Sequence, residues 1–211
     1  MLYFTATDRL VSLEEKMEIT LDKRERIIQA AVEVFGAAGF DTASMADIAA
    51  GAEVGKGTLY LYFPSKEELF EEVYQRCRGE RLQACGCNTE RLSSTLEKLF
   101  VRLRNGTRWE LAAPLKNRLV RAYLNHLRFN KKVRRVVDGQ DTQHPEPILQ
   151  QGVERGELRP MPVDLLAEMF VRFGSAVFYY IERNPEQAEN EDLWKQIYAS
   201  FCGCLGAADL G

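Results

Sequence analysis

Apolar residues recur every three or four positions along most of this 211-residue chain, which is the spacing that gives a helix one apolar face. The first such run extends from Ile27 to Ala38. Asp22-Lys-Arg-Glu25 has the form of a capping box and predicts that this helix begins at Asp22. Gly39 predicts where the helix ends, because glycine readily takes the left-handed conformation of a C-cap.

Two very short helices are predicted in the segment from Ser44 to Phe63. Ser44 is the predicted N-cap of the first, and Gly51 is predicted to make the turn after it. Gly55 to Tyr62 is the predicted second helix, and Pro64 ends it because proline cannot continue a helix. Two short helices joined by a tight turn are typical of a helix-turn-helix.

Helical spacing continues to the C-terminus. Ser65-Lys-Glu-Glu68 is a second capping box and predicts the start of a longer helix. A separate short segment is predicted around Trp109, and two amphipathic helices are predicted at residues 164–183 and 191–205. We find no segment with the alternation of a strand. The predicted fold is therefore all-α, with an N-terminal three-helix helix-turn-helix domain followed by a larger helical ligand-binding and dimerisation domain.

The second short helix is more polar and aromatic than an ordinary core helix. Leu59 and Phe63 are four residues apart and are predicted to pack inward. Its other side chains can then enter a DNA major groove, with Lys56 and Lys66 within reach of phosphates. The alternative is a small three-helix domain whose aromatic residues are simply core, as aromatic residues on short helices usually are.

From Arg26 to Leu69 the chain resembles the N-terminal domain of the TetR (tetracycline-repressor-like) family of transcriptional regulators. The matching residues are Ile27-Ile-Gln-Ala-Ala31, Phe35, Gly39-Phe40, Thr42, Ile48-Ala49, Ala52, Val54, Lys56-Gly-Thr-Leu-Tyr60, Tyr62-Phe63 and Ser65-Lys-Glu-Glu-Leu69. Gln150-Gln-Gly-Val-Glu-Arg-Gly-Glu-Leu158 also resembles a phrase common in the C-terminal half of that family.

The resemblance implies an all-α homodimer that binds a palindromic double-stranded DNA operator and a small-molecule effector. Repression that is released by the effector is the family's usual mode of action. The residues that match the family's DNA contacts are Thr42, Ser44, Gly55, Lys56, Gly57, Thr58, Tyr60, Leu61, Tyr62 and Lys66. Many members have serine where this chain has Gly55, so a hydroxyl contact to phosphate is lost here.

Charge is segregated along the chain, which has a net charge of −3 made up of −6 in residues 1–80, +11 in residues 81–136 and −8 in residues 137–211. The predicted DNA-binding end is acidic overall, so its affinity for DNA must come from local geometry and from Lys56 and Lys66. The basic middle either binds an anionic ligand such as an acyl-coenzyme A or a phosphorylated metabolite, or faces DNA, or forms solvated helix faces, as charge runs usually do.

Two sets of residues in the C-terminal part are candidates for binding. An apolar effector pocket with a few polar groups is predicted from Trp109, Tyr123, His126, Phe129, Phe170, Phe173 and Tyr179, although each alone is more often core. A four-helix dimer interface between the last two helices is predicted from Leu166, Phe170, Phe173, Gly174, Val177, Ile197 and Phe201. The alternative for the second set is packing within one chain.

The sequence offers little for catalysis. It has two histidines, no Gly-x-Ser-x-Gly elbow and no phosphate loop, so we expect no enzymatic activity and no cofactor. Among the five cysteines, Cys85-Gly-Cys87 and Cys202-Gly-Cys204 invite a metal or redox interpretation. One intervening residue makes tetrahedral chelation awkward, so no metal site is predicted, and a thiol or metal sensor is the alternative.

The expected location is the cytoplasm, without a membrane partner. No apolar run approaches the roughly 18 residues of a membrane helix, and the first residues lack the features of a secretory signal. Residues 1–16 are either an N-terminal arm or an over-extended start. The predicted boundaries are an extension at 1–20, the helix-turn-helix domain at 21–66, a connecting helix at 67–84 and the effector-binding and dimerisation domain at 85–211.

Overall fold

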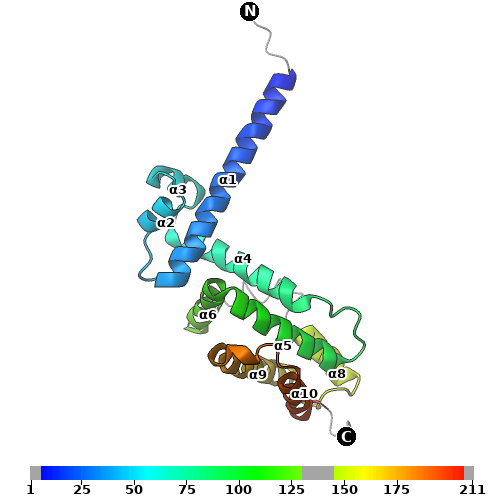
Figure 1. The fold of residues 1–211 in the computed structure, drawn as a ribbon. Helices are drawn as coiled ribbons and strands as arrows, with labels where there is room; N and C mark the ends of the chain where they lie inside the picture. Colours follow the sequence, from blue (N-terminus) through cyan, green and yellow to red (C-terminus); the bar gives the residue numbers. More distant parts are fainter. Residues whose placement is uncertain (1–5, 130–144, 207–211) are drawn as a thin grey trace, which may run out of the picture. The chain divides into compact units, whose positions relative to one another are not determined.

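The protein is a series of α-helices (Figure 1). The structure, a computed structural model, describes residues 6–129 and 145–206, with side chains over 22–122 and 145–206. The elements are α1 (Ala6–Ala38), α2 (Met45–Gly51), α3 (Lys56–Tyr62), α4 (Lys66–Gly86), α5 (Thr95–Ala112), α6 (Pro114–Phe129), α8 (Glu146–Glu154), α9 (Val163–Arg183), the 3₁₀ turn η1 (Pro185–Gln187) and α10 (Glu191–Leu205). Over these residues no strand forms, and one isolated antiparallel bridge joins Leu158 to Gly206. The predicted all-α fold is confirmed.

The chain divides into two compact units. The first contains Met1–Cys77 together with Leu115–Asn125, and the second contains Arg78–Pro114 together with His126–Gly211. Helices α4 and α6 therefore contribute to both units. No helix in the part of the chain that the structure describes combines the length and the hydropathy needed to cross a membrane.

The core of the first unit forms where α1, α2, α3 and the start of α4 meet. Its largest fully buried side chains are Phe35, Ile27, Ile28, Ile48, Leu59, Leu69 and Tyr74. The Phe70 ring lies 5.0 Å from the Phe35 ring and 4.8 Å from the Phe40 ring, centroid to centroid. Burying one such side chain stabilises a fold by about 1.5–3 kcal/mol. Because α2 and α3 have seven residues each, they depend on these contacts with α1 and α4.

Several predicted helix ends are confirmed. The Ser44 hydroxyl accepts a hydrogen bond from the Asp47 N–H at 3.1 Å and caps α2. The Ser65 hydroxyl accepts one from the Glu68 N–H at 3.1 Å at the start of α4. Gly39 adopts the left-handed conformation after α1, with φ at +80°. These features depend on three or four neighbouring residues, which is why local sequence predicts them.

The predicted start of the first helix at Asp22 is wrong. Helix α1 begins at Ala6 and passes through Asp22 without interruption. The Glu25 carboxylate does not close a capping box; it accepts a hydrogen bond from Gln29 at 3.0 Å and pairs with Arg76 of α4. A capping box is a local pattern, and here the same residue types serve a contact between two helices.

Two further predictions, at Gly51 and around Trp109, are wrong. Gly51 is the last residue of α2, and the left-handed residue of the turn is Glu53, with φ at +53°. A Cβ on Gly51 would lie 3.3 Å from the Ala30 Cβ, so this glycine lets α2 approach α1. The segment around Trp109 is not separate, because α5 runs unbroken through Gly106. A Cβ on Gly106 would lie 3.1 Å from the sulfur of Cys85 in α4.

The core of the second unit is formed by α5, α8, α9 and α10. Its buried members are Leu96, Leu99, Leu103, Leu149, Leu158, Leu166, Ala167, Val177, Ile181, Trp194, Phe201 and Leu205. The Trp194 indole N–H donates to the Ala188 carbonyl at 2.8 Å, so the ring is buried with its polar group satisfied. The predicted helices at 164–183 and 191–205 correspond to α9 and α10.

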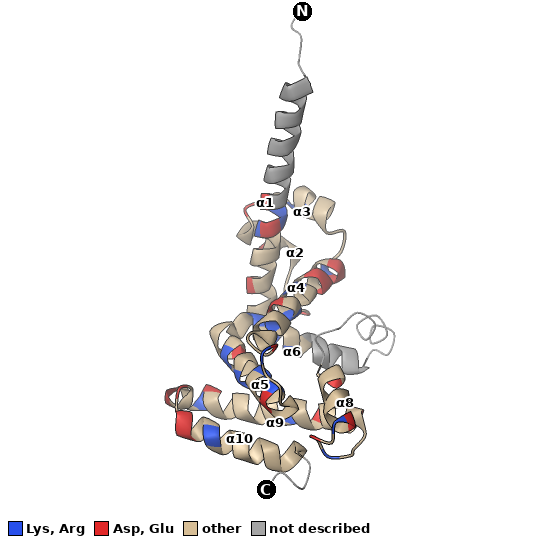
Figure 2. Cartoon of the chain, turned by 90° about the vertical axis from the view of Figure 1, so that its right-hand side faces the viewer, with Lys and Arg blue, Asp and Glu red and all other residues tan. Residues whose placement is uncertain are grey.

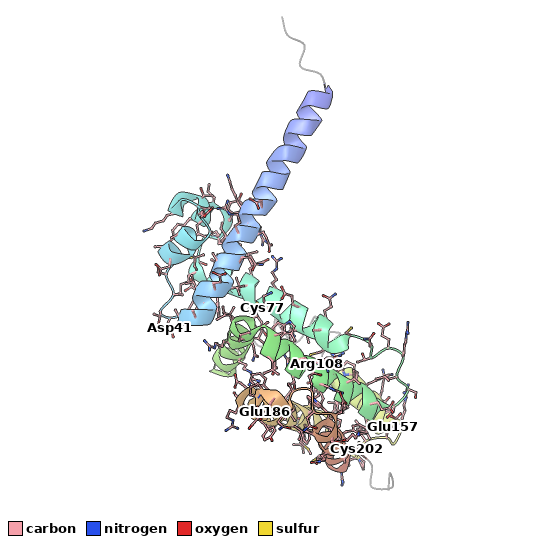
Figure 3. All side chains as sticks on the ribbon, in the orientation of Figure 1. Asp41, Cys77, Arg108, Glu157, Glu186 and Cys202 are labelled. Atoms are coloured by element: carbon pink, nitrogen blue, oxygen red, sulfur yellow. The ribbon has the colours of Figure 1, made fainter. Side chains whose placement is uncertain are left out.

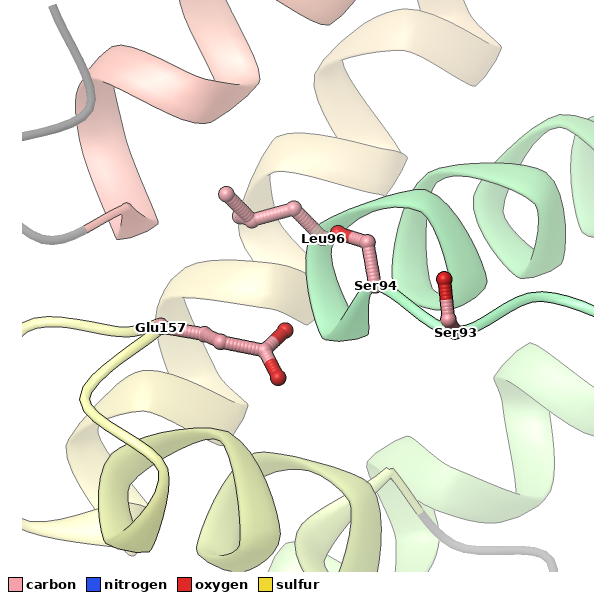
Figure 4. A pocket seen from close by; sticks show the side chains of 4 residues that line it. All are labelled: Ser93, Ser94, Leu96 and Glu157. Carbon is pink, nitrogen blue, oxygen red and sulfur yellow. The ribbon is translucent and has the colours of Figure 1, made fainter.

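The sequence segment Gln150–Leu158 has a structural explanation in this unit. A Cβ on Gly152 would lie 2.6 Å from the Thr95 side chain and 2.7 Å from that of Leu158, so α8 packs against the start of α5 only with glycine there. Gly156 takes a left-handed φ of +71° after α8. The Glu157 carboxylate then accepts a hydrogen bond from the Thr95 N–H at 2.6 Å and caps α5 (Figure 4).

Candidate nucleic-acid interface

Helix α3 has one buried face and one outward face. Leu59 is fully buried and Phe63 is 4% exposed, which confirms that these two side chains pack inward. Arg24 of α1 lies over the Phe63 ring, 5.3 Å from its centroid, and pairs with Glu72 of α4 at 2.9 Å. The end of α3 is therefore held by α1 and α4.

The outward face of α3 carries most of the predicted DNA contacts. Lys56, Gly57, Tyr60 and Leu61 are exposed, whereas Thr58 and Tyr62 are half-buried. Leu61 is 85% exposed and Tyr60 is 48% exposed. Large apolar side chains on a seven-residue helix beside a lysine form a surface that can contact bases as well as phosphates. Figure 1 shows α2 and α3 packed beside α1.

Gly55 is the N-cap of α3, with φ −68° and ψ 148° and no side-chain cap. This is an ordinary extended conformation that any residue can adopt. A Cβ at this position would have the Thr58 hydroxyl oxygen as its nearest neighbour, at 3.9 Å. Neither backbone conformation nor packing requires glycine here, so the position would accept serine.

The two predicted DNA contacts before α2, Thr42 and Ser44, differ in whether their hydroxyl groups are already engaged within the protein. Thr42 is exposed in the loop between α1 and α2. The Ser44 hydroxyl both accepts from the Asp47 N–H at 3.1 Å and donates to the Asp47 carboxylate at 2.7 Å. Its proton is thus engaged in the helix cap, whereas Thr42 presents its side chain to solvent.

Lys66, the second predicted phosphate contact, is bound within the first unit. Its ammonium donates to the carbonyls of Ala43 at 2.9 Å and Asp41 at 3.2 Å, and lies 4.5 Å from the centroid of the Phe40 ring. Figure 3 labels Asp41 in the loop that Lys66 holds. By contrast, Lys56 is exposed at the first position of α3.

Arg26 was not singled out from the sequence. Its guanidinium donates to the Ala52 carbonyl at 2.6 Å and to the Glu53 carboxylate at 3.0 Å, in the turn between α2 and α3. No local signal could have revealed this contact, because Arg26 and Ala52 are 26 positions apart.

Four of the predicted effector-pocket residues have described side chains, namely Trp109, Phe170, Phe173 and Tyr179. Phe170 and Phe173 both pack on Phe201, with ring centroids 6.1 and 5.4 Å away. Tyr179 is 47% exposed, and Trp109 is half-buried. The side chains of Tyr123, His126 and Phe129 lie outside the described residues. A surface hollow of about 340 Å³ is instead lined by Ser93, Ser94, Leu96 and Glu157 (Figure 4).

Several predicted interface residues lie in the core of the single chain. Leu166 and Phe201 are fully buried, and Val177 is 8% exposed. Gly174 faces α5, since a Cβ there would lie 3.8 Å from Leu103. Phe170, Phe173 and Ile197 are half-buried and pack against the same core. Leu166, Val177 and Phe201 are thus covered by their own chain, whereas the half-buried Phe170, Phe173 and Ile197 keep part of their surface accessible.

A different face of α9 is exposed. Its large apolar side chains there are Leu165, Val171, Tyr179 and Tyr180. The neighbouring face of α10 has small exposed residues, among them Ala199 and Gly203. Residues 196–205 contain no Lys, Arg, Asp or Glu, and this part of α10 is uniformly tan in Figure 2.

Three of the described basic residues of the middle segment pair with carboxylates within the second unit. Arg81 donates two hydrogen bonds to the buried Glu110 carboxylate, at 2.8 and 3.1 Å. Arg104 pairs with Glu191, and Arg108 with Glu189 at 2.9 Å. The hydrogen bond from Arg104 holds the pKa of Glu191 below its usual value. These contacts favour solvated, ion-paired helix faces for this segment. Residues 130–135 lie outside the described part.

The cysteines differ in their surroundings. Cys77 and Cys85 are buried, Cys202 is half-buried, and Cys87 and Cys204 are exposed. Burial raises the pKa of the Cys85 thiol, which makes it a weak nucleophile. Within residues 22–122 and 145–206, no three Cys, His, Asp or Glu side chains gather in a way that could hold a metal ion.

Comparison with known proteins agrees with this architecture. Residues 27–73 match the model of the bacterial regulatory proteins of the tetR family. The uncharacterized HTH-type transcriptional regulator YfiR of Bacillus subtilis is 28% identical over 165 residues, which cover 74% of this chain and 78% of YfiR. The fatty acid metabolism regulator protein of the same organism is 26% identical over 141 residues, which cover 65% of this chain and 71% of that protein.

Solved structures share the fold. A TetR family transcription regulator from Marinobacter aquaeolei VT8 superposes with a TM-score of 0.70 at 17% identity, covering 90% of this chain and 99% of its own. FadR of Bacillus subtilis, solved in complex with stearoyl-CoA, has a TM-score of 0.59 at 19% identity, covering 84% of this chain and 96% of its own. The match over residues 27–73 identifies this segment, from within α1 to within α4, as the N-terminal domain of the bacterial regulatory proteins of the tetR family, and the solved structures show that the chain shares the helical fold of such regulators.

Proposed function

We propose that this protein is a transcriptional repressor that binds a two-fold-symmetric DNA duplex as a homodimer and leaves it when a small molecule binds. The outward face of α3 is the observation that carries the proposal. Lys56, Tyr60 and Leu61 are exposed there, while Leu59 and Phe63 anchor the helix from behind. In this assignment Lys56 contacts a phosphate, and Thr58, Tyr60, Leu61 and Tyr62 face base edges, with Thr42, Ser44, Gly55 and Gly57 near the backbone.

Selection from random double-stranded DNA tests the DNA-binding part. We expect an enriched inverted repeat whose half-sites are separated by about one helical turn, because each protomer would present one α3. A protein without any preferred duplex would contradict the proposal. Because the contacts include phosphates, affinity should fall steeply as salt rises.

The proposed dimer interface is the exposed face of α9 with the adjoining face of α10. Leu165, Val171 and Tyr179 recur along α9, and the second half of α10 is uncharged. Apolar side chains repeated along a long helix favour a second protein surface over solvent. Sedimentation equilibrium measures whether the protein is a dimer in solution.

Long-chain acyl-coenzyme A thioesters are the first effectors to test. The support comes from relatives, since one is named a fatty acid metabolism regulator and FadR was solved with stearoyl-CoA. A ligand at 100 times its dissociation constant adds about 2.7 kcal/mol to stability, which a thermal-shift assay detects. Free coenzyme A and free fatty acid are the controls, and release of bound DNA by the same compound completes the test.

A second candidate is a DNA-binding protein that responds to no metabolite. The packing of Phe170 and Phe173 on Phe201, where an effector pocket was predicted, favours it. A broad ligand screen without stabilisation or DNA release, in a protein that still selects a duplex, would support this alternative over an effector-released repressor.

A further inference from the structure

We propose that Arg26 and Lys66 are positioning residues for DNA recognition, which hold the two ends of α2 and thereby fix where α3 stands. This inference rests on the proposed function, in which α3 reads the DNA. It assigns to both cations a role in geometry instead of a contact with phosphate.

Lys66 holds the entrance to α2. Its ammonium has three N–H groups, and it donates to the carbonyls of Ala43 at 2.9 Å and Asp41 at 3.2 Å, just before the Ser44 cap. It also lies 4.5 Å from the centroid of the Phe40 ring, an attractive position for a cation. The Phe40 ring packs on Phe70 of α4, so the loop is tied to the core.

Arg26 holds the exit from α2. Ala52 is the C-cap of α2, and its carbonyl accepts a hydrogen bond from Arg26 at 2.6 Å. A cation is favourable at this end of a helix, where carbonyls point outward. The same guanidinium nitrogen lies 3.0 Å from the Glu53 carboxylate and 3.4 Å from the Glu53 carbonyl.

The backbone conformation of Glu53 makes the contact of Arg26 with this turn more important. Glu53 adopts a left-handed φ of +53°, which residues other than glycine rarely take. Such a conformation persists where the surroundings enforce it. Arg26, from α1, donates to both the carbonyl and the carboxylate of this residue.

The two contacts matter because α2 and α3 are too short to fix their own direction. Each has seven residues, well below the length at which an isolated helix is stable in water. A small displacement of α3 would move the side chains of Thr58 and Tyr60 away from the base edges that they are proposed to meet. We call the contacts of Lys66 and of Arg26 clamps. Loss of either clamp should therefore impair discrimination between DNA sequences as well as overall affinity.

The test compares Lys66→Met and Arg26→Met with Lys56→Met as the matched control. Methionine keeps an unbranched apolar stem and removes the charge and the N–H donors. Each variant is titrated with the selected duplex and with the same duplex changed at one base pair, at several salt concentrations. The temperature is one at which circular dichroism shows every variant fully folded.

For the two clamp variants we expect the ratio of affinities for the two duplexes to fall about fivefold or more, with the slope of log K against log [salt] unchanged. For Lys56→Met we expect a uniform loss of affinity and a slope smaller by about 0.9, as for one lost phosphate contact. Arg26→Lys and Lys66→Arg should recover part of the discrimination, because each keeps a cationic donor.

Two results would overturn the inference. If Lys66→Met lowers the salt slope by about one and leaves the ratio unchanged, Lys66 contacts a phosphate. If the clamp variants keep wild-type affinity, slope and ratio and only melt earlier, they contribute stability alone.

Hydrogen exchange without DNA gives an independent measurement. Amide exchange over residues 45–62 should accelerate in Lys66→Met and Arg26→Met and stay unchanged in Lys56→Met; equal protection in all three would also overturn the inference. This readout separates the two proposals. A wild-type protein that selects no duplex contradicts DNA recognition alone, whereas one that selects a duplex while the clamp variants behave like Lys56→Met contradicts only the clamps.

Discussion

Both units of this protein expose large apolar side chains, but on very different helices. In the first unit Tyr60 and Leu61, 48% and 85% exposed, stand on the seven-residue α3. In the second unit Leu165, Val171 and Tyr179, at 46%, 47% and 47%, recur along the 21-residue α9. The same observation, apolar surface in contact with water, therefore has two different settings.

The length and the neighbours of each helix indicate which kind of molecule its exposed apolar residues bind. The apolar part of α3 is small and lies beside Lys56, which suits a ligand with both bases and phosphates. The exposed face of α9 repeats over several turns and lies beside an uncharged stretch of α10, which suits another protein surface. An apolar residue that fails to be buried is thus informative only together with the length and neighbours of its helix.

The sharpest test places the same charge on one exposed tyrosine of each unit. Tyr179→Glu should raise the dimer dissociation constant about 100-fold or more, because a two-fold interface would bury two unpaired carboxylates. Sedimentation equilibrium measures this. Tyr60→Glu should leave the dimer intact and abolish DNA binding, because it would place a negative charge against the polyanionic DNA. A Tyr179→Glu protein that dimerises like the wild type would show that the interface lies elsewhere.

A second test compares packing tolerance at one glycine from each unit. Gly152→Ala should cost about 1–3 kcal/mol in the free energy of unfolding, because its Cβ would lie 2.6 Å from Thr95. Gly57→Ala should add about 0.5–1 kcal/mol, because no atom lies within 4 Å and alanine favours a helix. Urea unfolding without DNA measures both. Equal costs would contradict the packed α5–α8 contact.

A smaller effect is expected at the N-cap of α3. Gly55→Ser should raise stability by a few tenths of a kcal/mol, because a hydroxyl can accept from the first N–H groups of the helix. It should also strengthen DNA binding about two- to fivefold if the same hydroxyl reaches a phosphate. Titration at two salt concentrations separates these effects. Weaker binding by a more stable protein would exclude that phosphate contact.

The smallest effect concerns pH. Hydrogen bonds from Gln29 and from Arg76 lower the pKa of Glu25. A lowered pKa in the folded state adds stability above the unfolded-state value and loses it as pH falls through the folded value. Glu25→Gln should therefore cost at most about 0.5 kcal/mol at pH 7, since solvent screens this exposed pair. The difference should decrease as pH falls below the ordinary pKa of a glutamate and vanish once the folded carboxyl is protonated, as measured by urea unfolding; a difference that does not change with pH would assign it to packing.

Helix caps show what local patterns can and cannot predict. Ser44, Ser65 and Gly39 behave as their immediate neighbours indicate. Asp22 does not, because Glu25 is engaged by Arg76 of another helix. Gly51 was assigned to the turn, yet it serves the approach of α2 to α1 while Glu53 makes the turn. A local pattern fails where a distant helix supplies a competing partner.

The two units also differ in how far their candidate sites could be predicted. On α3, a spacing of four residues correctly assigned Leu59 and Phe63 to the interior, which leaves the outward face determined. On α9 the amphipathic period was correct, but Leu166 and Val177 were assigned to a dimer interface and lie in the chain's own core. Periodicity identifies an apolar face without saying whether the same chain or a second one covers it.

Local sequence was sufficient for the all-α class, the helix-turn-helix and the inward face of α3, because helical period and capping depend on residues within one or two turns. Long-range contacts set the rest. The hydrogen bonds from Arg26 to Ala52 and from Lys66 to Ala43 join residues more than twenty positions apart. Which surface packs against each apolar face of α9 likewise depends on helices distant in sequence. Such choices follow from which surfaces meet when the chain folds, and no short segment encodes them.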